Sequence, residues 1–85
     1  MKVSVIIPTF NRFSLISRAI DSVLNQTIKP FEIIVVDDGS SDNTSTFIKN
    51  NYNSVKLIKQ NNLGVSKARN MGIKNSSGNW IALLD

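Results

Sequence analysis

Two neighbouring aspartates, Asp37 and Asp38, are the side chains best placed for chemistry in this sequence. They directly follow the apolar run of residues 33–36 and precede the turn residues Gly39 and Ser40. A run without a polar face predicts a strand covered on both sides, as in parallel sheets. Ligands of such sheets bind in the crevice outside the carboxyl ends of the strands. Because the chain has no histidine and no cysteine, acid–base or metal chemistry in this crevice would depend on carboxylates.

The two aspartates are expected to point to opposite faces of their strand and to have different roles. Side chains alternate along a strand, so Asp37 continues the row of Val35 and Asp38 the row of Val36. Either carboxylate could accept a hydrogen bond from a nucleotide base or ribose, or could cap the amides of a helix. The residues alone leave both roles open.

Four strands and three helices must position these side chains. Short β-branched or aromatic runs predict strands at residues 3–7, 31–37, 55–59 and 80–84. Helical spacing predicts one helix that ends near Asn25, one after the capping residues 39–42, and one between Gly64 and Ser76. The order β-α-β-α-β-α-β predicts an α/β fold, a Rossmann-like, doubly wound parallel sheet in the spatial order 3-2-1-4. The positions expected to face the sheet are Leu15, Ile16, Ala19, Ile20, Val23 and Leu24 in the first helix, Phe47 and Ile48 in the second, and Val65, Ala68, Gly72 and Ile73 in the third.

Three further features are expected at the same sheet edge. The end of the first strand, residues 8–11, supplies backbone carbonyls and a hydroxyl. Arg69 falls on the inward stripe of the third helix, where it could bind a diphosphate in bidentate fashion or reach past the stripe to solvent. Asp85 ends the last strand and completes an arc of acids that suits a divalent cation.

The composition and the absence of certain motifs argue against several classes of function for this chain, as follows from its charge, its hydropathy and its glycines. The ten basic residues are scattered and the net charge is only +4, so no nucleic-acid partner is expected. The chain has no stretch long and apolar enough for a signal peptide or a membrane span, which predicts a cytoplasmic location. It contains neither G-x-G-x-x-G nor G-x-x-x-x-G-K-[ST], the glycine-rich motifs that cradle phosphates.

The last predicted strand has no polar alternation, which is typical of a central strand, yet no further strand follows to cover it. We therefore expect residues 1–85 to be the N-terminal, incomplete half of a larger domain. In isolation the chain should aggregate or remain partly unfolded.

The sequence resembles the family 2 glycosyltransferases. The likeness rests on five blocks in the right order: VSVIIPTFNR at 3–12, SVLNQT at 22–27, FEIIVVDDGS with DNT from 31 to 44, GVSKARNMGI at 64–73 and SGNWIALLD at 77–85. The resemblance implies a GT-A fold whose Rossmann-like half binds a nucleotide-sugar, typically a UDP-sugar. It implies inverting transfer to an acceptor hydroxyl on a carbohydrate, a lipid-linked molecule or a protein, and it is compatible with peripheral association at the inner face of a membrane.

The same resemblance assigns roles to residues. Pro8 and Thr9 would form part of the base-binding wall, Asp38 would read the base, and Arg69 would lie near the diphosphate. Asp85 would be the first acid of the D-x-D motif and a partial ligand of Mg²⁺ or Mn²⁺. Asp37 and Asn11 are expected to give support. The second D-x-D acid and the general base would fall beyond residue 85, so no catalytic residue is expected within this chain and the chain alone should transfer no sugar.

Two other functions fit part of the sequence. A two-component receiver domain would also show an acidic pair after one strand and an aspartate at the end of another, but it leaves residues 1–30 unexplained and gives Arg69 no role. A nucleotide-binding module without activity is the third reading.

Overall fold

The computed structural model describes residues 1–84, and the predicted site residue Asp85 lies outside this part. Seven elements alternate along the chain as predicted. They are β1 (Val3–Thr9), α1 (Phe13–Leu24), β2 (Glu32–Asp37), α2 (Thr44–Asn51), β3 (Val55–Lys59), α3 (Val65–Lys74) and β4 (Trp80–Leu83). The main difference in bounds is that β1 continues to Thr9, so that Pro8 belongs to the strand.

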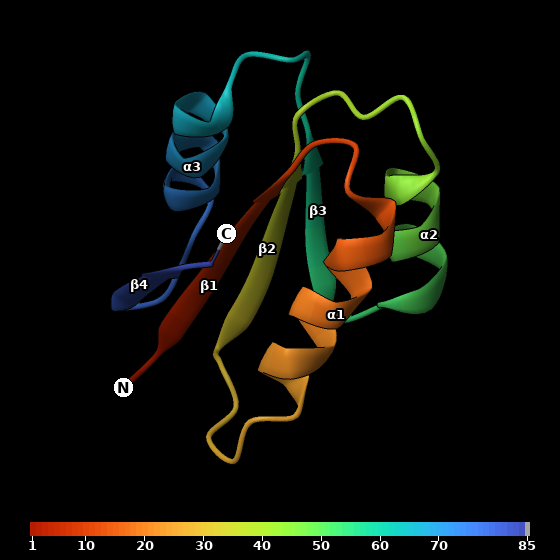
Figure 1. The fold of residues 1–85 in the computed structure, drawn as a ribbon. Helices are drawn as coiled ribbons and strands as arrows, with labels where there is room; N and C mark the ends of the chain where they lie inside the picture. Colours follow the sequence, from red (N-terminus) through yellow and green to blue (C-terminus); the bar gives the residue numbers. More distant parts are fainter. Residues whose placement is uncertain (85) are drawn as a thin grey trace.

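The strands form one parallel sheet in the order β3-β2-β1-β4, which confirms the predicted arrangement (Figure 1). Thr9 pairs with Asp37 at the end of β1 and β2, and Asp37 pairs with Lys59 of β3. The carboxyl ends of three strands therefore meet at one edge. Since β4 pairs only with β1 among the described residues, it forms an edge of this sheet.

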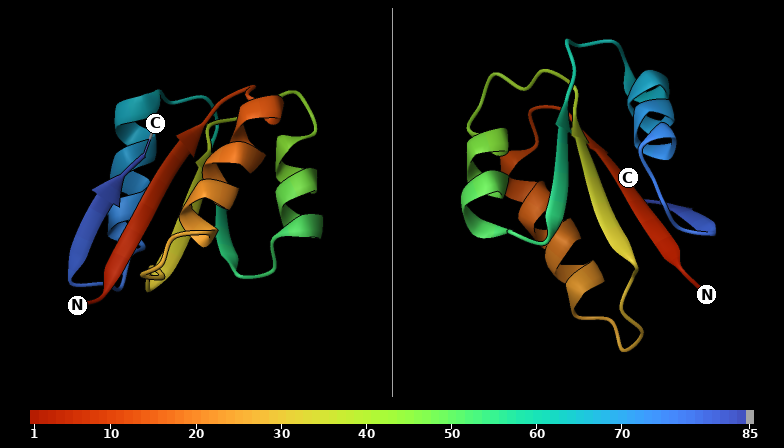
Figure 2. Two further views of the ribbon diagram at one scale, coloured as in Figure 1. Left: turned by 60° about the horizontal axis from the view of Figure 1, so that its bottom comes forward. Right: turned by 180° about the vertical axis from the view of Figure 1, so that it is seen from behind.

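Helices cover both faces of the sheet: α1 and α2 lie on one face and α3 on the other (Figure 2). Val35 packs with Ile20 of α1 and Ile48 of α2, whereas Val36 packs with Ala68 of α3. Side chains alternate between faces, so a strand buried from both sides must be apolar at every position. This explains the unbroken apolar run of β2.

The inward face of the helices differs from the prediction at three positions. Leu15, Val65 and Ile73 are 48%, 51% and 41% exposed. Helix α3 contacts the sheet through Ala68 and Gly72, and Ile73 is rotated about 100° away from Gly72 on the helix. A Cβ on Gly72 would lie only 2.4 Å from Cγ2 of Ile6, so the missing side chain allows α3 to approach the sheet closely.

Within residues 1–84, no helix is both long enough and apolar enough to cross a lipid bilayer.

Candidate functional site

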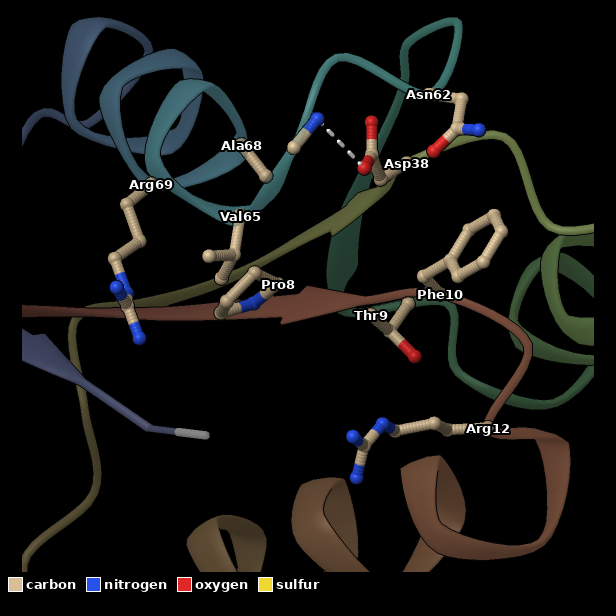
Figure 3. Close-up of a pocket in the computed structure, with 10 residues that line it drawn as sticks. Pro8, Thr9, Phe10, Arg12, Asp38, Asn62, Val65, Ala68 and Arg69 are labelled. Atoms are coloured by element: carbon tan, nitrogen blue, oxygen red, sulfur yellow. Dashed lines mark hydrogen bonds between the residues drawn. The ribbon is translucent and has the colours of Figure 1, made fainter.

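A pocket of about 550 Å³ lies at the carboxyl edge of the sheet, between the ends of β1 and β2 and the start of α3 (Figure 3). Four of the five residues predicted to bind the ligand line it, and the fifth, Asp85, lies outside the described residues. The lining residues are Pro8, Thr9, Phe10, Arg12, Asp38, Asn62, Gly64, Val65, Ala68 and Arg69. Val65 is exposed because it faces this pocket at the first turn of α3 and not the sheet.

Asp38 is buried and holds the loop that leads from β3 to α3. Its Oδ1 accepts hydrogen bonds from Nε2 of Gln60 at 2.8 Å and from the amide of Leu63 at 2.7 Å. Its Oδ2 accepts one from the amide of Gly64 at 3.0 Å, drawn in Figure 3. Burial would raise the pKa of Asp38, but these three bonds outweigh it and leave the pKa below its ordinary value. Each carboxylate oxygen accepts about two bonds, so Oδ2 retains capacity for one more.

Asp37 points to the other face of β2, as strand parity predicted. Its Oδ1 accepts a hydrogen bond from the amide of Ser40 at 3.0 Å, and its Oδ2 accepts one from the hydroxyl of Ser45 in α2. Asp37 is 2% exposed and does not line the pocket. Its contacts hold the loop and the helix that follow β2.

Asn11 connects the loops that follow β1 and β2. Its backbone has a left-handed φ of 52°, a conformation that asparagine tolerates better than most residues. The amide of Asn11 donates to Oγ of Ser40 at 2.8 Å, and its Oδ1 accepts a bond from the amide of Ser41 at 2.8 Å. Asn11 therefore holds two loops together beside the pocket without lining it.

Pro8 and Thr9 bring the end of β1 into the pocket wall. The carbonyl of Thr9 accepts the amide of Asp38 at 2.9 Å, which extends the pairing of β1 and β2 to the pocket. The hydroxyl of Thr9 is buried and has no hydrogen-bond partner within residues 1–84. Buried polar groups normally have a partner, so this hydroxyl is suited to a ligand atom.

Two guanidinium groups reach the pocket from different elements. Arg69 extends from α3 and Arg12 from the residue that precedes α1, with Pro8 and Thr9 between them in Figure 3. The individual role of Arg12 was not predicted, although its position directly after the end of the first strand was a usable signal. Phe10 belongs to the segment of residues 8–11 that was expected at this edge, and the other lining residues that were not predicted are Asn62, Gly64, Val65 and Ala68.

The described part of the chain contains no group of three or more acidic, histidine or cysteine side chains that could hold a metal ion. The carboxylate of Asp38 is engaged by N–H donors, and Asp37 faces away from the pocket. Asp37 and Asp38 therefore do not face one common position where a cation could lie.

Comparisons with known proteins agree on one family. The profile of Glycosyl transferase family 2 matches residues 4–85. An uncharacterized glycosyltransferase of Rickettsia bellii is 48% identical over 86 residues, which is 99% of this chain and 12% of that protein. This chain thus spans about an eighth of the length of that curated relative.

Comparisons with solved structures indicate the same family. A crystal structure of Staphylococcus aureus TarS superposes with a TM-score of 0.88 at 33% identity, over 100% of this chain and 27% of that one. TarS has also been solved in complex with UDP, with a TM-score of 0.81. The mannosyltransferase PcManGT of Pyrobaculum calidifontis, in complex with GDP-Man and Mn²⁺, has a TM-score of 0.83 at 25% identity over 94% of this chain and 26% of that one. The chain therefore belongs to glycosyltransferase family 2 and has the α/β architecture of the GT-A fold.

Proposed function

We propose that residues 1–85 are the donor-binding, incomplete half of a glycosyltransferase domain and that the pocket binds the nucleoside diphosphate part of a nucleotide-sugar. The observation that carries this proposal is the pocket itself, in which one carboxylate and two guanidinium groups converge at the carboxyl edge of the sheet. The complexes of TarS with UDP and of PcManGT with GDP-Man support a ligand of this class.

The nucleoside would be recognised by groups at the ends of β1 and β2. Oδ2 of Asp38 can accept one more hydrogen bond, which suits the ring N–H of uracil. The hydroxyl of Thr9 can donate to or accept from the ligand, since nothing in residues 1–84 occupies it. Pro8 and Phe10 offer apolar surface against a flat base. This arrangement favours a UDP-sugar as the donor.

The diphosphate would be recognised by Arg12 and Arg69. A guanidinium group binds phosphate oxygens through two parallel N–H donors, which gives both charge and geometry. The negative charge of a leaving nucleoside diphosphate increases as the bond to the sugar breaks, so fixed positive charge near it would stabilise the transition state. The two arginines would thus both hold the donor and assist its departure.

The complete domain would transfer the sugar, with inversion, to an acceptor hydroxyl, and residues 1–85 would contribute no catalytic base. Mg²⁺ or Mn²⁺ is the proposed cofactor, with Asp85 as a partial ligand and the Mn²⁺ in the PcManGT complex as support. A divalent cation supplies charge stabilisation to phosphate oxygens. The match to family 2 leaves the receiver-domain reading without support.

Isothermal titration calorimetry of the full-length protein with UDP tests the proposal, and the three arginines of the chain offer a matched control. Arg12→Ala and Arg69→Ala should each weaken UDP binding by roughly 10- to 100-fold, because a hydrogen bond to a charged group contributes about 1.5–3 kcal/mol. Arg18→Ala should leave the affinity unchanged, since Arg18 is exposed on α1 and does not line the pocket. Absence of UDP binding to the unmodified protein, or equal effects of all three variants, would refute the proposal.

A further inference from the structure

Strand β4 has no sequence feature of its own that selects its register on β1. All four residues of Trp80–Leu83 are apolar and all four are exposed in the described structure, with Trp80 and Leu83 61% and 51% exposed. A slip by one residue normally moves an apolar row from the core to solvent, and this difference fixes the register of an alternating strand. In β4 a slip would exchange one apolar side chain for another. The register must therefore be set outside the strand.

The turn that precedes β4 is bound to the starts of β1 and β2 by one carboxylate. Oε2 of Glu32 accepts hydrogen bonds from the hydroxyl of Ser4 at 2.6 Å and from the amide of Ser77 at 2.5 Å. The same hydroxyl of Ser4 accepts the amide of Gly78 at 2.9 Å. We call these four residues, Ser4, Glu32, Ser77 and Gly78, the Glu32 clip. The hydrogen bonds of the clip join β1, β2 and the turn before β4, so the clip ties this turn to both strands.

The turn also lies directly against the backbone where β1 begins. The amides of Asn79 and Trp80 both donate to the carbonyl of Lys2, at 2.7 and 3.1 Å. A Cβ on Gly78 would lie 2.5 Å from Oγ of Ser4 and 2.7 Å from the carbonyl oxygen of Lys2. No other residue type fits at Gly78 without a shift of the turn. The first residue of β4 is consequently placed by contacts that a slipped register would break.

The clip lies at the amino edge of the sheet, where Ser4 pairs with Glu32, and none of its residues lines the pocket. Glu32 is the only glutamate in the sequence. Strand β4 runs from the clip toward the pocket edge, where Leu83 pairs with Ile6 and the amide of Leu84 donates to the Ile6 carbonyl at 2.9 Å. Pro8, which lines the pocket, is only two residues further along β1.

We propose that Glu32 is a positioning residue for the donor site: it fixes the register of β4 on β1, the strand whose carboxyl end forms the pocket wall. This inference rests on the proposed function, in which that pocket binds the donor. A slip by one residue would break the pairing of Leu83 with Ile6, two residues before Pro8 in the pocket wall.

Hydrogen exchange, read by mass spectrometry on the full-length protein, tests the register directly. Glu32→Ala should speed the exchange of the β4 amides at least 10-fold and leave α1 unchanged, because the lost carboxylate binds the Ser77 amide of the turn and the Ser4 hydroxyl of β1 and no group of α1. Glu32→Gln keeps an oxygen that can accept both bonds and should restore most of the protection. Ser4→Ala, which removes a single oxygen, should also speed β4 exchange and serves if Glu32→Ala does not fold. Asp21→Ala is the control, since it removes another hydrogen-bonded carboxylate, the partner of Tyr52 at 2.8 Å, and should not affect β4.

Unchanged β4 exchange in Ser4→Ala and Glu32→Ala, or faster exchange over the whole chain, would overturn the inference. The link to the site is read from UDP affinity, which Glu32→Ala should weaken and Glu32→Gln should largely restore. Equal UDP affinities for Glu32→Ala and the unmodified protein would show that register and site are unconnected. If the unmodified protein binds no UDP, the proposed function fails, whereas the exchange result still decides whether the clip holds β4.

Discussion

The two edges of the sheet use a carboxylate in different ways. At the amino edge, Glu32 and Ser4 form bonds with each other and with the turn before β4. At the carboxyl edge, Asp38 holds the loop before α3 but keeps capacity on Oδ2, and the Thr9 hydroxyl beside it has no partner within the described chain. An acid at a strand end is therefore no evidence of a ligand by itself. A pocket lined by a buried hydroxyl without a partner in residues 1–84 is what separates the binding edge from the structural edge.

The largest change in stability is expected from removal of the carboxylate at the binding edge. Asp38→Ala would leave three donors without their acceptor and should lower the free energy of unfolding by about 2 kcal/mol or more. Urea denaturation of the full-length protein measures this change. Thr9→Val, at the same edge, is the matched comparison. A stability for Asp38→Ala equal to that of the unmodified protein would contradict a role of Asp38 in holding the loop.

A side chain added where α3 closely approaches the sheet should reduce stability nearly as much. Gly72→Ala places a methyl group 2.4 Å from Cγ2 of Ile6, and overpacking of this kind costs about 1–3 kcal/mol. Lys74→Ala, on the exposed side of the same helix, should be close to neutral. If thermal unfolding separates the two variants by less than about 0.5 kcal/mol, α3 does not pack as described.

Lowering the pH should reduce the stability that the carboxylates at both edges contribute. The pKa of Glu32 lies below its ordinary value of 4.5, chiefly because of the hydrogen bond from Ser4, and the pKa of Asp38 lies below its ordinary value of 3.8. The unfolded chain therefore takes up protons first as the pH falls, so the stabilisation is complete above these ordinary values and is lost as the pH drops through the lowered ones. Denaturation midpoints from neutral pH to about pH 3 should fall. Glu32→Gln and Asp38→Asn should each reduce this dependence, and identical pH profiles for all three proteins would refute it.

The smallest changes in stability are expected from removal of the hydroxyls of Ser4 and Thr9, and the two should differ. Ser4→Ala removes a bonded hydroxyl and should cost about 1 kcal/mol, whereas Thr9→Val removes an unbonded one and should be neutral or slightly stabilising. UDP affinity should show the reverse order, with a loss of about three- to tenfold for Thr9→Val. Denaturation and calorimetry on the same two variants give both values. Equal changes for the two variants in both measurements would remove the distinction between the edges.

Most of the fold follows from the sequence because its signals are local. The apolar run of β2, the alternation of elements and the parity that separates Asp37 from Asp38 depend only on strand geometry and short connections. The exposed positions of Val65 and Ile73 were mispredicted, because α3 contacts the sheet through Ala68 and Gly72 while Val65 lines the pocket.

The pocket was predictable in part. Pro8, Thr9, Asp38 and Arg69 were identified because they follow strand ends or lie on an unusual helix face. Asn62 and Gln60 were missed, because their positions depend on how the loop after β3 folds back onto Asp38. The clip was missed for a similar reason: Ser4 and Ser77 are 73 residues apart in sequence, and no local pattern marks their contact with Glu32.

The most direct test of the central claim is a hydrogen-exchange footprint of UDP on the full-length protein. The account predicts slower exchange in the peptides that contain residues 8–12 and 60–69 at the carboxyl edge, and no change in the peptide that contains residues 76–79 at the amino edge. Saturating UDP that leaves the carboxyl-edge peptides unchanged, or that protects only the amino edge, would contradict the assignment of the pocket as the donor site.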